Sequence, residues 1–141
     1  MIAKLVLCIF LIRATITDIA RRQIENRLVL GMLIGRSAIT LGNYCYGQKI
    51  MFDVDTVSSQ LIVMIVLVMF YSLEQDNFAA GDIKLLLVGQ LFLAEKELIP
   101  WFVLMSILAI LTSFIIKAHR RLPLAPFVLL STLIITVMDY I

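Results

Sequence analysis

Charged residues are scarce in this sequence, and so are most residues that build metal sites. Only 16% of the 141 residues are charged and 62% are hydrophobic, whereas soluble domains are about 45–50% apolar. There is too little polar surface to cover a globule in water. The composition therefore predicts a single polytopic membrane domain over residues 1–141.

Cysteine and histidine number only two and one. Cys8 and Cys45 lie in or beside apolar segments and form no CxxC pair, which argues against a zinc site or a disulfide framework. No serine, cysteine and histidine are placed for nucleophilic catalysis, since His119 lies in a basic loop. The net charge of +2 is too small to indicate nucleic-acid binding. We expect no cofactor and no metal.

The apolar runs are long and continuous, without the alternation of barrel strands, which indicates helices that satisfy their own backbone in lipid. We predict an all-α integral membrane protein with six transmembrane helices. The fourth segment is short for a span of about 20 residues unless it extends back to Phe78. The expected segments are Met1–Thr17, Leu28–Tyr44, Val57–Leu73, Ile83–Leu93, Leu98–Ala118 and Leu122–Tyr140.

Basic residues gather in alternate loops. The first and fifth loops are rich in them, whereas the second and fourth hold one lysine each. The positive-inside rule therefore predicts that odd-numbered loops are cytoplasmic and that both termini lie outside. The decisive residues are Arg13, Arg21, Arg22 and Arg27 in the first loop and Lys117, His119, Arg120 and Arg121 in the fifth.

Two aspartates fall at the same predicted face of the membrane. Asp18 follows the first span, and its ordinary interpretation is an interfacial acid or a helix cap. Asp82 precedes the fourth span, where it would make a good helix N-cap after Gly81. An ionisable residue so close to a span is nevertheless a candidate functional residue.

A pair of carboxyl groups held close together could hydrolyse a peptide bond without a metal. They cannot both ionise easily in a low-dielectric site, so the pair would hold one proton near neutrality. The ionised member could then take a proton from water while the protonated member polarises a carbonyl group. The separation of Asp18 and Asp82, and which of them acts first as the base, stay open.

The residues around the aspartates form two short motifs. The first comprises Asp18, Ile24 and Asn26, and the second comprises Gly81, Asp82, Lys84 and Leu85. The first resembles the first signature of the prepilin peptidases, the aspartic endopeptidases of type IV pilin systems. The second is similar to that family's Gly-x-Gly-Asp-x-Lys-Leu signature. The chain resembles the short form of the family, without the cysteine-bearing cytoplasmic region of larger relatives.

This resemblance implies a membrane hydrolase in which Asp18 and Asp82 form the catalytic dyad. The implied partners are a prepilin or pilin-like precursor, which would lose its short basic leader, and the lipid bilayer. The implied location is the cytoplasmic face of a bacterial inner membrane. Two positions depart from the family pattern, because Glu25 replaces a proline and Ala79 replaces the first glycine of the second signature. Substrate identity and oligomeric state stay open.

The predicted second span carries a stripe of small residues from Gly31 to Gly42 at GxxxG-type spacing. Such a stripe indicates close packing of two helices. Our narrower hypothesis is that it holds the second span against the fourth, at Gly89, and so fixes Asp18 relative to Asp82.

Two charged residues have more than one interpretation. Arg36 lies inside the second span, where a charge requires a partner or a polar cavity. Lys84 could contact a substrate or an acid, or could be a positive-inside lysine. Two other functions therefore stay open. One is a small ion-coupled transporter or channel subunit using Asp82 and Arg36. The other is an inactive structural subunit of a pilus or secretion assembly, which the departures at Glu25 and Ala79 would suit.

Overall fold

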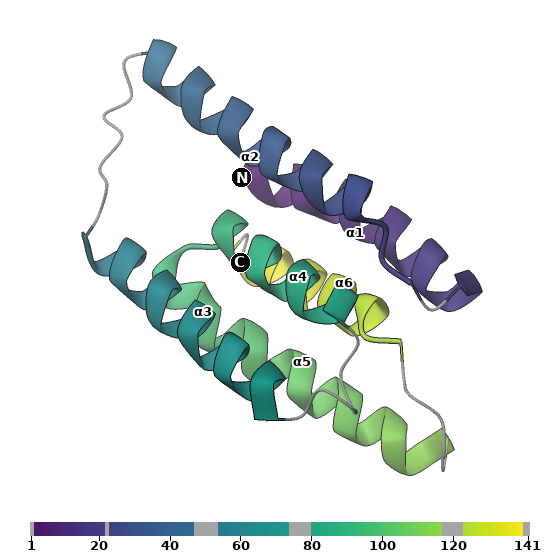
Figure 1. The fold of residues 1–141 in the computed structure, drawn as a ribbon. Coiled ribbons are helices and arrows are strands. Elements are labelled where there is room, and N and C mark those ends of the chain that lie inside the picture. The colour runs from purple at the N-terminus through teal and green to yellow at the C-terminus, as the bar shows by residue number, and fades with distance from the viewer. Residues whose placement is uncertain (1, 22, 47–53, 74–79, 117–122, 140–141) are drawn as a thin grey trace.

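A computed structural model describes residues 2–21, 23–46, 54–73, 80–116 and 123–139. All regular structure in these ranges is helical, which confirms the all-α part of the prediction. Each of the six predicted apolar segments corresponds to one helix (Figure 1). The helices are α1 (Ile2–Arg21), α2 (Asn26–Cys45), α3 (Val54–Leu73), α4 (Ala80–Gly89), α5 (Glu95–Ile116) and α6 (Ala125–Met138), and the 3₁₀ helix η1 (Gln90–Phe92) continues α4.

Length and composition single out α2. Among the described residues it is the one helix both long and apolar enough to cross a membrane, and shorter apolar helices cover Asp55–Met69 and Ala125–Met138. The number of spans and their orientation therefore stay predictions.

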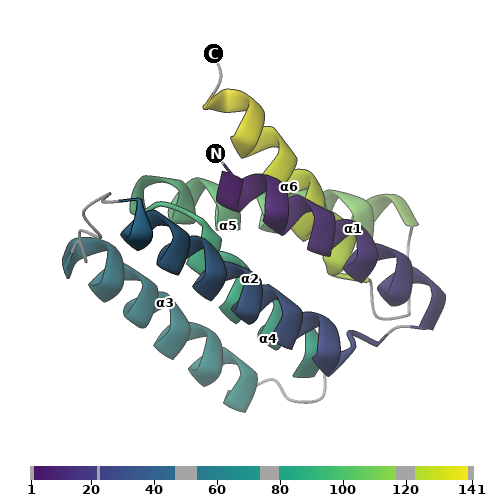
Figure 2. The ribbon, with the colours of Figure 1, turned by 90° about the horizontal axis from the view of Figure 1, so that it is seen from above.

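The helices form a bundle with α4 near its middle. α4 contacts α2, α3 and α6, whereas α1 packs against α2 and α6 (Figure 2). The interior is apolar, with Leu11, Leu85 and Trp101 fully buried. The outward faces are apolar too, as Ile9 on α1 and Ile62 on α3 illustrate with 68% and 62% exposure. Apolar side chains on both the inner and the outer faces of helices are typical of membrane proteins.

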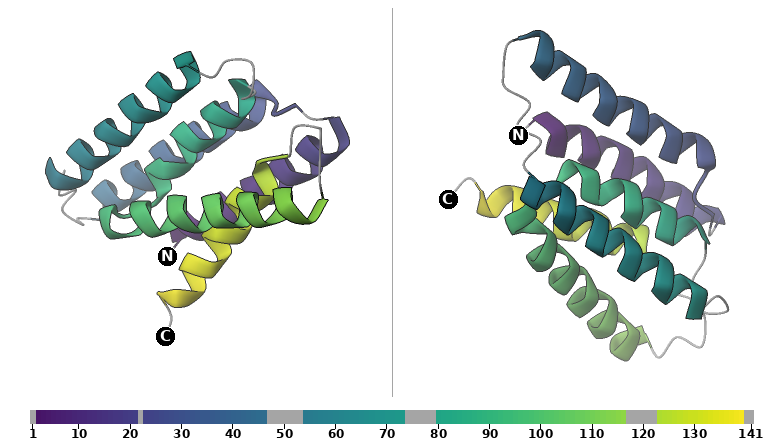
Figure 3. Two further views of the ribbon diagram at one scale, coloured as in Figure 1. Left: turned by 90° about the horizontal axis from the view of Figure 1, so that it is seen from below. Right: turned by 60° about the vertical axis from the view of Figure 1, so that its left-hand side comes forward.

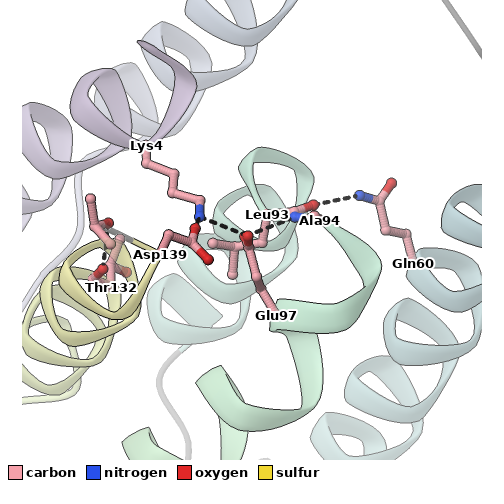
Figure 4. A network of polar contacts seen from close by, with 8 residues as sticks. Lys4, Gln60, Leu93, Ala94, Glu97, Thr132 and Asp139 are labelled. Atoms are coloured by element: carbon pink, nitrogen blue, oxygen red, sulfur yellow. Dashed lines mark hydrogen bonds and ion pairs between the residues drawn. The ribbon is translucent and has the colours of Figure 1, made fainter. Parts of the chain in front are cut away.

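One end of the bundle carries a charged network (Figure 4). Lys4 Nζ lies 2.7 Å from Oε1 of Glu97 and also contacts Oδ2 of Asp139. The second carboxylate oxygen of Glu97 accepts the backbone N–H of Ala94 at 3.1 Å, which caps the start of α5. The network joins the beginning of α1, the beginning of α5 and the end of α6. The predicted topology requires these three ends to lie on one side.

The small-residue stripe of α2 packs against α1. A Cβ atom on Gly31 would lie 3.1 Å from the Phe10 ring, and one on Gly35 would lie 3.4 Å from the same ring. Gly89 of α4 instead lies against Trp101 of α5. The hypothesis that the stripe joins α2 to α4 at Gly89 is therefore wrong. A stripe of small side chains in a sequence indicates that another helix packs closely against it, but it does not identify that helix.

The structure identifies a neighbour for Arg36. Its guanidinium carbon lies 6.0 Å from the centre of the Phe92 ring in η1, which is a cation–π distance. This contact connects the middle of α2 to η1, which follows α4.

Candidate functional site

The two sequence motifs meet at the end of the bundle opposite the charged network. Gly81, in the first turn of α4, lies against Ile24 in the connection between α1 and α2. A Cβ atom at Gly81 would come within 3.1 Å of the Ile24 Cβ and 3.4 Å of its backbone nitrogen. Only a residue without a side chain allows this approach without a shift.

A hydrogen bond joins the same two motifs one turn further along α4. Lys84 Nζ donates to Oδ1 of Asn26 at 3.1 Å, although the lysine is exposed. Through this bond, Lys84 links α4 to the first residue of α2. Four of the six predicted site residues are thus paired between motifs, namely Gly81 with Ile24 and Lys84 with Asn26.

Asp18 lies near the end of α1 and is only 4% exposed. Its Oδ2 accepts the backbone N–H of Ala125 at 3.0 Å. Ala125 is the first residue of α6, and the first N–H groups of a helix have no acceptor within it. A carboxylate at this position also interacts favourably with the helix dipole. Asp18 is therefore a cap, as its ordinary interpretation allowed, but it caps α6 from another helix.

The start of α6 explains why it takes a cap from α1. Its N-cap position is Leu124, which has no polar side chain, and Pro126 in the first turn has no N–H to satisfy. Ala125 was not predicted from the sequence, because a backbone donor has no side-chain signature. The signal available was a proline-marked helix start without a Ser, Thr, Asp or Asn before it.

Asp82 is the third residue of α4 and is partly buried. The prediction that it is an N-cap is wrong, because α4 begins earlier, at Ala80. Since Gly81 is held against Ile24, the adjacent Asp82 belongs to the end of the bundle at which Asp18 lies.

Of the two departures from the family pattern, only Glu25 lies among the described residues. Glu25 is the N-cap of α2, with an extended backbone at φ −66° and ψ 131° and no capping hydrogen bond from its side chain. Ala79 lies outside the described residues, as do the basic residues of the fifth loop. The part of the chain that the structure describes contains no group of three or more histidine, cysteine, aspartate or glutamate residues that could hold a metal ion.

Comparison with known proteins gives the family. Residues 5–115 match the profile of the type IV leader peptidase family. The chain belongs to this family. The match confirms the resemblance to the prepilin peptidases and supports a peptidase activity for this leader peptidase family member. It includes both motifs and ends before Ala125. No curated protein and no solved structure matches the chain.

Proposed function

We propose that this chain is an aspartic endopeptidase that removes the short basic leader from prepilins or pilin-like precursors. It would span the inner membrane of a bacterium six times, as one domain, with odd-numbered loops in the cytoplasm. The observation that carries the proposal is the contact between the two motifs, Gly81 against Ile24 and Lys84 against Asn26. It brings the segments that bear the two aspartates to one end of the bundle.

In the proposed reaction, Asp18 and Asp82 share one proton. The ionised carboxylate takes a proton from water, and the water oxygen attacks the carbonyl carbon of the scissile amide. The protonated carboxyl group donates to the carbonyl oxygen, and a proton then passes to the leaving amine as the C–N bond breaks. The N–H of Ala125 would hold the Asp18 carboxylate in place during these steps.

The surface of the bundle supports a membrane location. The outward faces of α1 and α3 are lined by isoleucine, leucine, valine and methionine that would be costly to expose to water. The buried charged side chains lie near the two ends of α1, with Lys4 and Glu97 at one end and Asp18 at the other. This distribution suits a bundle that lies across a bilayer.

The test is cleavage of co-expressed prepilins, followed as a mass shift. We expect Asp18→Asn and Asp82→Asn each to lower cleavage by about 10³-fold or more, with normal amounts of protein in the membrane. Asp55→Asn, at an exposed position in the first turn of α3, is the matched control and should cleave normally. Full cleavage by both dyad variants would refute the dyad. Solute flux in vesicles without cleavage would favour a transporter, and neither activity would favour an inactive subunit.

A further inference from the structure

We propose that this protein fits a locally thinned bilayer, with an apolar layer of about 21 Å at α1, α4 and α6. The partner is therefore a membrane of a particular thickness. The inference rests on the membrane location in the proposed function, but it does not depend on which residues catalyse.

The first evidence is the spacing of charges on α1. Lys4 and Asp18 are both buried, at 8% and 4% exposure, and both are held by polar partners at opposite ends of the bundle. They stand 14 positions apart on one helix, which corresponds to about 21 Å at 1.5 Å per residue. The hydrocarbon core of a typical bilayer is about 30 Å thick.

The helix α6 has the same length between the same two ends of the bundle. It has 14 residues, about 21 Å, between Ala125 at the Asp18 end and Asp139, which immediately follows it at the Lys4 end. Asp139 is exposed, so its charge is presented to the surroundings and not enclosed by the bundle. Tilting either helix would shorten the layer further.

The middle helix gives the same result. α4 has 10 residues and η1 has 3, which together rise about 21 Å before the chain becomes extended at Leu93. The charged start of α5, with Glu95 and Glu97, follows directly. Two helical units, α4 with η1 and α6, and the stretch of α1 between Lys4 and Asp18 thus cover the same short distance between the two polar ends.

The remaining helices have ordinary membrane lengths, as does the whole of α1 with its 20 residues. α2 and α3 have 20 residues each and α5 has 22, or about 30–33 Å. α3 packs against α4 and is clearly the longer of the two (Figure 3). A bilayer of normal thickness would cover the long helices and also bury the charged network of Lys4, Glu97 and Asp139. Because charge in hydrocarbon is costly, the lipid beside the short helices has to thin instead.

Thinning has a consequence for the candidate site. Beside α1 and α6, the headgroups and water at the Lys4 end would lie closer to the Asp18 end. The apolar barrier around the half-buried start of α4 would be correspondingly thinner. Arg13 is exposed on α1 within this stretch, five positions before Asp18, so its long side chain would have to extend to the headgroups on the site's own side.

The test compares vesicles of phosphatidylcholine with monounsaturated chains of 14, 18 and 22 carbons. We expect the unfolding temperature of the reconstituted full-length protein to be highest with 14 carbons and about 5 °C lower or more with 22. The variant Lys4→Met/Glu97→Gln/Asp139→Asn removes the charges of the network and should prefer 18 carbons. The amide oxygen introduced by Glu97→Gln can still accept the Ala94 N–H, and Asp55→Asn should keep the preference of the unchanged protein.

An unfolding temperature that is independent of chain length, or highest with 18 or 22 carbons, would overturn the inference. The series with the unchanged protein decides this even if the triple variant does not fold. The readout needs no substrate, so the two proposals can fail separately. Preference for 14 carbons without any leader cleavage would refute the proposed function alone, and cleavage with a preference for 18 carbons would refute thinning alone.

Discussion

The backbone of Gly81 lies directly against Ile24, so that α4 touches the connection between α1 and α2 without an intervening side chain. Gly81 is part of a regular helix. The glycine is therefore required for space and not for an unusual backbone dihedral. This close approach lies next to Asp82 and links the two motifs.

Replacing Gly81 with alanine should lower cleavage. The new Cβ atom would stand 3.1 Å from the Ile24 Cβ, so one of the two segments must move by a few tenths of an ångström. We expect about a tenfold loss for Gly81→Ala and a larger one for Gly81→Val, since small misplacements of reacting groups are costly. The measurement is the leader cleavage rate at equal protein amounts. An unchanged rate for both variants would show that this contact does not position Asp82.

A valine at Gly31 should destabilise the protein, whereas a valine at Gly42 should not. The first would press on the Phe10 ring, and nothing lies within 4 Å of a Cβ atom at the second. We expect a loss of about 1–3 kcal/mol for Gly31→Val. Both glycines lie in α2, so the change in helix propensity is shared and the difference reports packing. Thermal unfolding in micelles measures it, and equal midpoints would contradict the α1–α2 contact.

Restoring the family's proline at Glu25 should be tolerated. The φ of −66° at this N-cap already matches that of proline, and no capping bond of the side chain is lost. We expect Glu25→Pro to raise the free energy of unfolding by about 0.4–1 kcal/mol by restricting the unfolded chain. Glu25→Ala, which removes the charge without restricting the backbone, is the control. A destabilised proline variant would mean that the backbone here cannot accept the family residue.

Removing the hydroxyl of Thr132 should leave a buried donor unsatisfied. Nε1 of Trp101 donates to this hydroxyl at 2.9 Å, and both residues are fully buried. Thr132→Val should cost about 1–3 kcal/mol. Thr136→Val is the matched control, because that hydroxyl donates only to a carbonyl of its own helix. Equal unfolding temperatures for the two variants would mean that the indole hydrogen bond contributes little to stability.

The helices could be predicted because lipid-compatible segments are continuous and apolar, which leaves little choice of secondary structure. Their ends were less accurate. α1 continues to Arg21, so that Asp18 lies within a helix, and α4 starts at Ala80 and so includes Asp82 in its first turn. Polar residues near a helix end are compatible with both helix and loop, and composition alone does not distinguish them.

The motif residues of the site could be identified, but not their contacts. Gly81 and Lys84 were recognised from local patterns, and nothing local specified Ile24 and Asn26 as their neighbours. The contact of Arg36 with Phe92 was not predicted for the same reason, because Phe92 lies in another helix. Pairings between helices depend on how the bundle is packed, which a single sequence does not encode in any short window.

The bond between Asp18 and Ala125 joins residues that are 107 positions apart. Synthesis from the N-terminus makes the carboxylate 107 residues before its backbone donor. During synthesis, α1 is therefore made before α6, and Asp18 lacks this hydrogen bond until α6 is present. The hydrogen bond can form only when α6 has docked against α1. Asp18 therefore gains this bond only after the helices from α2 to α5 have been made.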